Sequence, residues 1–517
     1  KMAIKVGGTT VIDDSRALNN ITSVDATTVA ALGTAGVGGG GGSFDMTATG
    51  SITAGKVVAL NSNGTVSAVV NQAGDPATSL SQATNNAIRQ RTPFSSHAVD
   101  DARQRVVRVY LDQDNNNYGT AVCGQIDTSG NITWGSPVVF QNSSLDCNLV
   151  VVYHKNNLDY YVFMKDPGNN QPKVTRMSNT SGTSLTVGSS YSNPGSHGTC
   201  SSEGYAGVYD PDQQRVVFVW YSTGAGEGVA ASFSSLSAVP AVGVFSASNW
   251  SQYSDMTYDT ANNKAVFLWQ YSANNTVRAH VITVGASSIS VASAVNTSYN
   301  GGAIPRCTFD PDSGKVIAIS SSTGDTLRYG MGTVSGTSSS WTNGTISSSG
   351  VPNTQGQYDL TYDTGADKLL ISYRKWNTQT AQMRQGSISG TTLTLGSEVE
   401  TYSSGSTDFM RLDYLPTSGV AVMTANISAS NNNLGSAVTS VIASTNSSWF
   451  GIADESISSG SAGKITHIGG INESVSGLTT GVIYYADKVG GLSSTSTGYK
   501  VGKAISATKL LITEGNA

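Results

Sequence analysis

The stretch FDPDSGKVIAI (Phe309–Ile319) contains the element that decides the fold of this chain. It is an aromatic residue, an aspartate, a four-residue turn, a basic residue and an apolar run. The aspartate position recurs at residues 100, 154, 210, 259, 310, 363 and 415, at intervals of about fifty residues. The clearest other copies are YDPDQQRVVFVW (Tyr209–Trp220), YDTANNKAVFLW (Tyr258–Trp269) and YDTGADKLLIS (Tyr362–Ser372). Val99–Val109 is a looser copy, and two eroded copies begin at Tyr153 and Tyr414.

The repeated turn has a physical explanation. A carboxylate at its first corner can accept hydrogen bonds from the backbone amides two residues ahead, and glycine can supply a left-handed corner. We expect that corner at Gly314, Gly365 and Gly419. A residue that recurs around the fold serves the fold, so a structural role, not calcium binding or catalysis, is predicted for Asp100, Asp210, Asp259, Asp310 and Asp363.

Each period contains four short strands. One strand precedes the turn, the apolar strand follows it, and an alternating segment and a hairpin such as QIDTSGNITWGSPVVF (Gln125–Phe140) complete the period. Four strands in each of seven periods predict an all-β fold with a seven-bladed β-propeller over residues 85–445. An open stack of meanders or two sandwiches is the alternative, but sandwiches rarely repeat one turn at near-constant spacing.

Composition agrees with an all-β protein and excludes several function classes. Of 517 residues only 12% are charged, and 58 are glycine, which suits many tight turns. A net charge of −5 without a basic cluster argues against nucleic-acid binding. No run reaches the roughly eighteen apolar residues of a membrane helix, and the N-terminus has no secretory core. We expect a chain assembled in the host cytoplasm, without membrane insertion, and released in a particle.

Neither a cofactor nor a metal is indicated. The five histidines are scattered, and the four cysteines are expected to be reduced core residues, with a Cys147–Cys200 pair as the alternative. No nucleophile elbow or P-loop is present, so the chain is not expected to be an enzyme. One cluster that the fold could still assemble comprises Arg306, Arg328, Arg374, Glu227 and Tyr299.

The repeats are framed by other segments. Residues 1–43 end in a glycine run and are predicted to be an extended anchoring arm, with a short helix near Asp25–Leu32. Residues 44–84 and 446–517 are predicted to form one small β-module into which the propeller is inserted. Six apolar residues of this module are candidates for oligomer packing, with filling of the module's own core as the alternative: Ile483, Tyr484, Tyr485, Leu510, Leu511 and Ile512.

Both ends of the chain resemble a known group of proteins. The opening AIKVGGTTVIDDSRALNNITS (residues 3–23) resembles the N-terminal arm of structural proteins of marine tailed phages, especially cyanophages. GSITAGKVVALNSNGTVS (residues 50–67), with WFGIA (449–453) and YKVGKAISATKLLI (499–512), resembles a module of phage fibre and tail-appendage proteins. The resemblance covers about 140 residues. It implies a virion protein whose arm binds other virion proteins and whose central insert varies.

The loops between the second and third strands of each blade are expected to be long and to carry function. They combine aromatic rings with amides, which suits sugars. The predicted ligand contacts are Tyr221, Tyr271, Tyr373, Trp376, Asn116 and Asn274. The sequence therefore predicts a fibre or appendage, expected as a homotrimer, that recognises a host-surface glycan or protein. A decoration protein and a virion-associated glycan-degrading enzyme are the alternatives.

Overall fold

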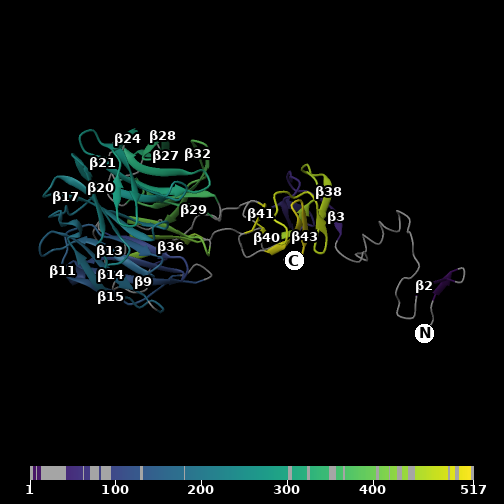
Figure 1. The fold of residues 1–517 in the computed structure, drawn as a ribbon, viewed down its shortest axis with the longest axis horizontal. Coiled ribbons are helices and arrows are strands. Elements are labelled where there is room, and N and C mark those ends of the chain that lie inside the picture. Colours follow the sequence, from purple (N-terminus) through teal and green to yellow (C-terminus); the bar gives the residue numbers. More distant parts are fainter. Residues whose placement is uncertain are drawn as a thin grey trace. The chain divides into compact units, whose positions relative to one another are not determined.

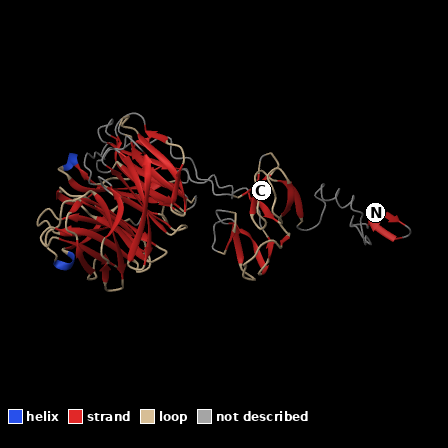
Figure 2. Ribbon diagram, turned by 90° about the horizontal axis from the view of Figure 1, so that it is seen from above, coloured by secondary structure: helices blue, strands red, loops and turns tan. Residues whose placement is uncertain are grey.

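The computed structural model describes the chain as strands with two short 3₁₀ helices, η1 (Gln113–Asn115) and η2 (Pro194–Ser196) (Figure 2). The residues described are 4–6, 9–12, 42–61, 63–69, 81–82, 95–127, 132–179, 181–300, 305–322, 326–347, 357–364, 367–375, 377–402, 407–418, 420–427, 433–439, 449–486, 490–494 and 500–513. They form two compact units, one of Lys1–Gln72 with Ser444–Ala517 and one of Ala73–Ala443.

The larger unit is a seven-bladed β-propeller (Figure 1). Each blade is an antiparallel sheet, and the innermost strands contact one another in the closed ring β7–β12–β16–β20–β25–β29–β34–β7. These innermost strands are β7 (Ser96–Asp100), β12 (Val150–His154), β16 (Ala206–Asp210), β20 (Trp250–Asp259), β25 (Arg306–Asp310), β29 (Tyr358–Asp363) and β34 (Thr407–Leu415). The predicted propeller is thereby confirmed, because each copy of the turn ends one innermost strand.

The outer layers of the blades repeat in chain order. The second strands are β8 (Arg105–Asp112), β13 (Asp159–Lys165), β17 (Arg215–Ser222), β21 (Lys264–Tyr271), β26 (Lys315–Ser322), β30 (Lys368–Arg374) and β35 (Val420–Ile427). The third strands are β9 (Tyr118–Ile126), β14 (Pro172–Ser178), β18 (Glu227–Phe233), β22 (Thr276–Val284), β27 (Thr326–Ser335), β31 (Ala381–Ser389) and β36 (Asn433–Thr439). The outermost strands are continuous in β15 (Thr186–Ser192), β19 (Ala241–Ser246) and β28 (Ser338–Ser347), and divided in β10 (Ile132–Trp134) with β11 (Val138–Ser144), β23 (Ile289–Val291) with β24 (Val295–Asn300), and β32 (Thr392–Leu395) with β33 (Val399–Tyr402).

The seventh blade takes its outermost strand from the beginning of the propeller. β6 (Ser81–Gln82) pairs with β36 through Ser81↔Ser436 and Gln82↔Gly435. The ring is thus closed by hydrogen bonds between two distant parts of the chain. The predicted boundary at residue 85 was wrong in this respect, because it assigned Ser81 and Gln82 to the module. Two residues are too short for a strand pattern to be visible in the sequence.

The aspartates close their own turns. Asp210 Oδ1 accepts hydrogen bonds from the amides of Asp212 at 2.9 Å and Gln213 at 3.0 Å. The carboxylates of Asp259 and Asp310 bind the amides two and three residues ahead in the same way. In the second blade His154 Nδ1 takes this role and accepts from Asn157 N at 3.3 Å. The imidazole therefore substitutes for the carboxylate as acceptor.

The left-handed corner lies four residues after the aspartate position. Gly314 has φ +64°, and Gln104, Leu158, Gln214, Asn263 and Asp367 occupy the equivalent corner with φ of 52–58°. In the sixth copy the corner is therefore Asp367, whereas Gly365 and Gly419 lie outside the described residues. Five blades accept a non-glycine residue at a conformation that costs about 1 kcal/mol or more. The hydrogen-bonded turn compensates that strain.

The aromatic residue of the motif has a partner in the preceding blade. Burial raises the pKa of the Tyr258 hydroxyl, and the carboxylate of Asp210 from the blade before raises it further. Tyr362 stands in the same relation to Asp310. Asp210 and Asp310 thus serve their own turns and also lie close to the tyrosine of the next blade. For these two copies, this contact accounts for the pairing of an aromatic residue with an aspartate in the motif.

The apolar core lies within and between the blades. Trp220 and Trp269, in the second strands β17 and β21, are buried. Phe163 packs on Phe218 and Trp220 of the next blade with ring centroids 5.3 and 5.4 Å apart. All four cysteines are buried free thiols, so the alternative Cys147–Cys200 pair is not formed. Burial raises the pKa of the Cys147 thiol to about 12.

The smaller unit joins the two ends of the sequence. One sheet has the order β3–β38–β37–β4–β5, so two strands from after the propeller lie between strands from before it. A second sheet has the order β39–β43–β42–β40–β41. The propeller is therefore inserted in a small β-module. Its strands are β3 (Ser43–Thr47), β4 (Val57–Leu60), β5 (Val66–Ala68), β37 (Trp449–Ala453), β38 (Ala462–Thr466), β39 (Ile471–Asn472), β40 (Ile483–Ala486), β41 (Leu492–Ser493), β42 (Lys500–Ser506) and β43 (Lys509–Ile512).

Near the N-terminus, β1 (Ile4–Val6) and β2 (Thr9–Ile12) form a hairpin. The short helix predicted near Asp25–Leu32 lies outside the described residues, as does most of the glycine run. In the described part of the chain no helix is long and apolar enough to cross a membrane.

Candidate functional site

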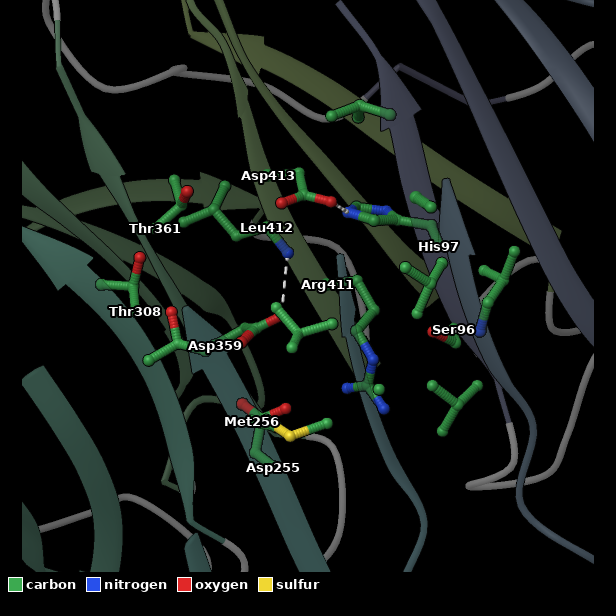
Figure 3. Close-up of a pocket in the computed structure, with 18 of the residues that line it drawn as sticks. Ser96, His97, Asp255, Met256, Thr308, Asp359, Thr361, Arg411, Leu412 and Asp413 are labelled. Atoms are coloured by element: carbon green, nitrogen blue, oxygen red, sulfur yellow. Dashed lines mark hydrogen bonds and ion pairs between the residues drawn. The ribbon is translucent and has the colours of Figure 1, made fainter. Parts of the chain in front are cut away.

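The seven innermost strands enclose an axial channel, which contains a cavity of about 380 Å³ (Figure 3). Every innermost strand contributes residues to its wall. The volume lies in the range of about 300–1,000 Å³ that is typical of small-molecule sites. Because the strands share one register relative to their turns, wall residues can be compared position by position.

Four residues before the turn aspartate, the wall is charged on one side only. The fourth to seventh blades place alternating acids and bases there, whereas the first three place small or apolar residues. The charged set is Asp255, Arg306, Asp359 and Arg411, and the other set is Ser96, Val150 and Ala206.

Two residues nearer the turn, the same division continues. The charged side presents Thr257, Thr308, Thr361 and Asp413, and the opposite side presents Ala98, Val152 and Val208. The channel is therefore amphipathic around its circumference: one wall offers hydroxyls and charges, and the other offers aliphatic surface.

The acids of this wall hold neighbouring blades together. Asp255 Oδ2 accepts a hydrogen bond from Cys307 N at 2.8 Å. Asp359 Oδ2 accepts one from Leu412 N at 2.9 Å, as Figure 3 shows. Each amide belongs to the next blade, three residues before its turn position. Ser96 Oγ makes the equivalent, longer contact with Val151 N at 3.4 Å. This position therefore has a structural task in three blades.

Enclosure by the ring shifts the titration of these groups. Burial raises the pKa of Asp359 to about 6, although Arg306 and Arg411 act in the opposite direction. The Asp413 side chain is 41% exposed to the channel, and the surrounding strands desolvate it in part. This desolvation, with the nearby Asp359 and Asp255, raises the pKa of Asp413 to about 8. Burial also lowers the pKa of the Arg411 guanidinium to about 10, which leaves it charged at neutral pH.

Beside Asp413, a buried polar cluster fills the seam between the seventh and first blades. His97 Nε2 lies 3.5 Å from Asp413 Oδ2 (Figure 3), and His97 Nδ1 lies 2.8 Å from Thr424 Oγ1. Arg108, which is fully buried, donates to Thr424, to Ser95 Oγ and to Asn426 Oδ1. Burial, with Arg108 and Arg411, lowers the pKa of His97 well below its usual value. His97 is therefore neutral at physiological pH.

A second candidate surface lies at the seam of the third and fourth blades. Tyr221 packs edge-on against Trp250 with centroids 5.7 Å apart, and Trp250 contacts Trp269. The Arg278 guanidinium lies 3.5 Å from the centroid of the Tyr271 ring, and the exposed Asn249 donates to the Tyr271 hydroxyl at 3.3 Å. Tyr221, Trp250 and Tyr271 are each half-buried. We call these three rings the seam cluster.

The other predicted ligand residues do not join the seam cluster. Asn274 is exposed in the same blade as Tyr271, but its Oδ1 accepts from Thr276 N and Oγ1. Asn116 is exposed in the first blade. Tyr373 is a wrong prediction, because only 1% of it is exposed and its hydroxyl donates to Glu398 Oε2 at 2.5 Å. β30 continues to Arg374, past Ser372 where the quoted sequence motif ends, so Tyr373 belongs to the strand and not to the loop. Trp376 lies outside the described residues.

The module residues proposed for oligomer packing divide between two faces. Tyr484, Leu510 and Ile512 are buried in the module's own core, so for them the alternative of core filling is correct. Ile483 is 38% exposed, and Tyr485 and Leu511 are half-buried. Side chains alternate along a strand, so neighbouring residues of β40, and likewise of β43, face opposite sides of their sheet.

The charged arc of the channel was missed in the sequence analysis, although a signal was present. Aligning the copies on their turn aspartate puts Asp255, Arg306, Asp359 and Arg411 in one column. The possible arginine cluster is not assembled: Arg306 lines the channel, but Arg328 and Arg374 lie on the outer strands β27 and β30. Glu227 instead contacts His197 Nδ1 at 2.8 Å. The side chain of Tyr299 lies outside what the structure describes.

No group of three or more His, Cys, Asp or Glu side chains in the described ranges is arranged to hold a metal ion. The five aspartates of the turns lie in five different blades.

No protein-family model matches the chain, and no curated protein matches its sequence. Among solved structures, the chain is similar to a periplasmic gluconolactonase of Pseudomonas aeruginosa, with 12% identity, a TM-score of 0.45, and coverage of 70% of this chain and 97% of that one. It is also similar to the fucose-specific lectin of Aleuria aurantia, with 14% identity, a TM-score of 0.40, and coverage of 60% and 95%. At these scores neither likeness assigns a ligand or a reaction to this chain.

Proposed function

We propose that this chain is a virion structural protein, the fibre or appendage of a tailed phage, whose propeller recognises a host-surface glycan. The seam cluster carries the glycan part of the proposal. Sugars combine apolar C–H faces with hydroxyls, so half-buried rings beside amide and guanidinium groups are suited to bind them. Tyr221, Trp250 and Tyr271 supply the rings, and Asn249 and Arg278 supply the polar groups.

The rings of the seam cluster are held in place before any ligand binds. Tyr271 lies beneath the Arg278 guanidinium and edge-on to Trp269, and Trp250 packs against Phe245 and Phe267 of the core. A rigid aromatic surface loses little conformational entropy on binding. This supports a recognition surface over a purely decorative one.

The virion part of the proposal is supported by the resemblance at both chain ends. The arm would dock on other virion proteins, and the module would associate as a homotrimer through its second face, where Ile483 is exposed. Several propellers on one particle would convert weak single contacts into firm attachment, because later binding events become intramolecular.

The test is the binding of fluorescently labelled full-length protein to host cells. We expect saturable binding that periodate oxidation of the cell surface abolishes and protease treatment spares. Tyr271→Ala should weaken binding at least tenfold. The matched control is Tyr118→Ala, which removes the half-buried tyrosine that begins β9 in the first blade.

Three results would contradict the proposal. Folded protein that shows no saturable binding would exclude host recognition. Binding lost to protease but not to periodate would identify a protein receptor in place of a glycan. Equal binding by Tyr271→Ala and the wild type would remove the seam cluster from the site.

A further inference from the structure

The axial channel has satisfied acceptors and unsatisfied donors. The carboxylate of Asp359 accepts from Leu412 N and from its own neighbour Leu360 N at 3.0 Å. Asp255 is likewise bonded by the amides of Cys307 and Met256. Each of these acids therefore already accepts two backbone N–H groups, which use about half of the acceptor sites of a carboxylate.

The guanidinium groups are less fully used. Arg411 Nη1 donates to Met410 O at 2.8 Å. The Arg306 side chain makes no hydrogen bond or ion pair within 4 Å to another described residue, and its Nε is buried without a partner. A buried donor without an acceptor is unfavourable, because it has lost its hydrogen bond to water. Two guanidiniums with spare donors, beside acids that already accept backbone amides, favour an anion, and a carboxylate matches their planar geometry.

The next layer of the wall favours a polyhydroxylated ligand. The hydroxyls of Thr257, Thr308 and Thr361 have no hydrogen bond to another residue that the structure describes, and Thr308 and Thr361 lie on the same side of the channel (Figure 3). Asp413, in the same layer, is partly exposed to the channel. Opposite, Val152 and Val208 offer aliphatic surface for the C–H face of a ring.

We propose that the axial channel binds a sugar acid, with its carboxylate between Arg306 and Arg411 and its hydroxyls on Thr257, Thr308 and Thr361. Small carboxylates without hydroxyls would use only the first layer, and neutral sugars only the second. The site is separate from the seam cluster and does not depend on host recognition. The sugar acid can be free or can be the terminal residue of a glycan, because the same groups recognise both.

Isothermal titration of the full-length protein with matched sugar pairs tests the proposal. Glucuronate and galacturonate are compared with glucose and galactose, and acetate controls for a bare carboxylate. We expect each uronate to bind at least tenfold more tightly than its neutral counterpart and than acetate. An oligosaccharide that ends in glucuronate is the second arm: tighter binding than the free uronate indicates a glycan end, and weaker binding a free sugar acid.

Variants locate the site. Arg306→Gln and Arg411→Gln should each weaken uronate binding at least tenfold, and Thr308→Val about threefold to tenfold. Tyr271→Ala, in the seam cluster, should leave uronate binding unchanged while it weakens cell binding. Circular dichroism shows whether each variant is folded. If the arginine variants unfold, the wild-type sugar pairs and Thr308→Val still decide the question.

The proposal is overturned if neutral sugars or acetate bind as tightly as the uronates, if no uronate binds, or if the folded arginine variants bind like the wild type. Cell binding without uronate binding would leave the proposed function intact and remove only the channel site. Uronate binding without cell binding would support the channel site and contradict the proposed host recognition.

Discussion

Replacing Asp210 by alanine tests the role of the repeated turn. Only 1% of Asp210 is exposed, and its Oδ1 accepts two backbone amides, at 2.9 and 3.0 Å. Hydrogen bonds to a charged group contribute about 1.5–3 kcal/mol each. Water can reach the turn and replace part of that loss, so we expect Asp210→Ala to lower the free energy of unfolding by about 2–4 kcal/mol.

The assay is thermal unfolding followed by tryptophan fluorescence, since six of the seven tryptophans lie in the propeller and one, Trp449, in the module. With an unfolding entropy of roughly 2 cal/mol/K per residue, the expected loss lowers the propeller's Tm by about 3–5 °C. Asp212→Ala is the control, because Asp212 is exposed in the same turn. The reasoning would be refuted if both variants melted within 1 °C of each other.

Three further predictions concern other parts of the propeller. Asp413 keeps its proton in the folded state up to a pKa of about 8, whereas an unfolded aspartate loses it near pH 4, so stability should fall as pH rises between these values. When urea unfolding is compared at pH 5 and 8, Asp413→Asn should reduce this loss of stability by about 1–2 kcal/mol, a figure lowered to allow for the partial exposure of the side chain. An unchanged pH dependence would contradict the raised pKa of Asp413. A Cβ at Gly228 would lie 2.2 Å from Phe245 Cζ, so Gly228→Ala should lower the free energy of unfolding by about 1–3 kcal/mol in the same assay. A Cβ at Gly224 has its nearest neighbour 3.5 Å away, so Gly224→Ala should leave the stability nearly unchanged. Equal effects of the two variants would show that the Phe245 ring moves aside freely. The four buried thiols should react with a thiol reagent only after denaturation, and rapid reaction of the native protein would indicate an open blade seam.

The sequence predicted the propeller because its turn chemistry is local. Asp310, its two amide partners and the corner at Gly314 lie within five residues, so one copy of the repeat contains every residue that forms the turn. The insertion in the module was also predictable, because strand patterns outside the repeats occur at both ends of the chain, such as VVAL (Val57–Leu60) before them and WFGIA (Trp449–Ala453) after them.

Features that depend on closure were not predictable in the same way. β6 is two residues long and can be recognised as a strand only from its pairing with β36, more than 350 residues later in the sequence. Tyr373 reads as a loop aromatic, but the end of β30 turns it inward onto Glu398. The channel wall arises where seven strands converge, so Arg306 and Arg411 stand out from surface residues only when the copies are aligned on their turns.

The pairing of β6 with β36 makes closure of the ring a contact of long sequence separation. In its register, Ser81 faces Ser436, so the seventh blade gains its outermost strand only when residues more than 350 positions apart have met. The entropy cost of closing so long a loop is offset only when the other blades are already in place. The closure of the ring is therefore expected among the last steps of folding.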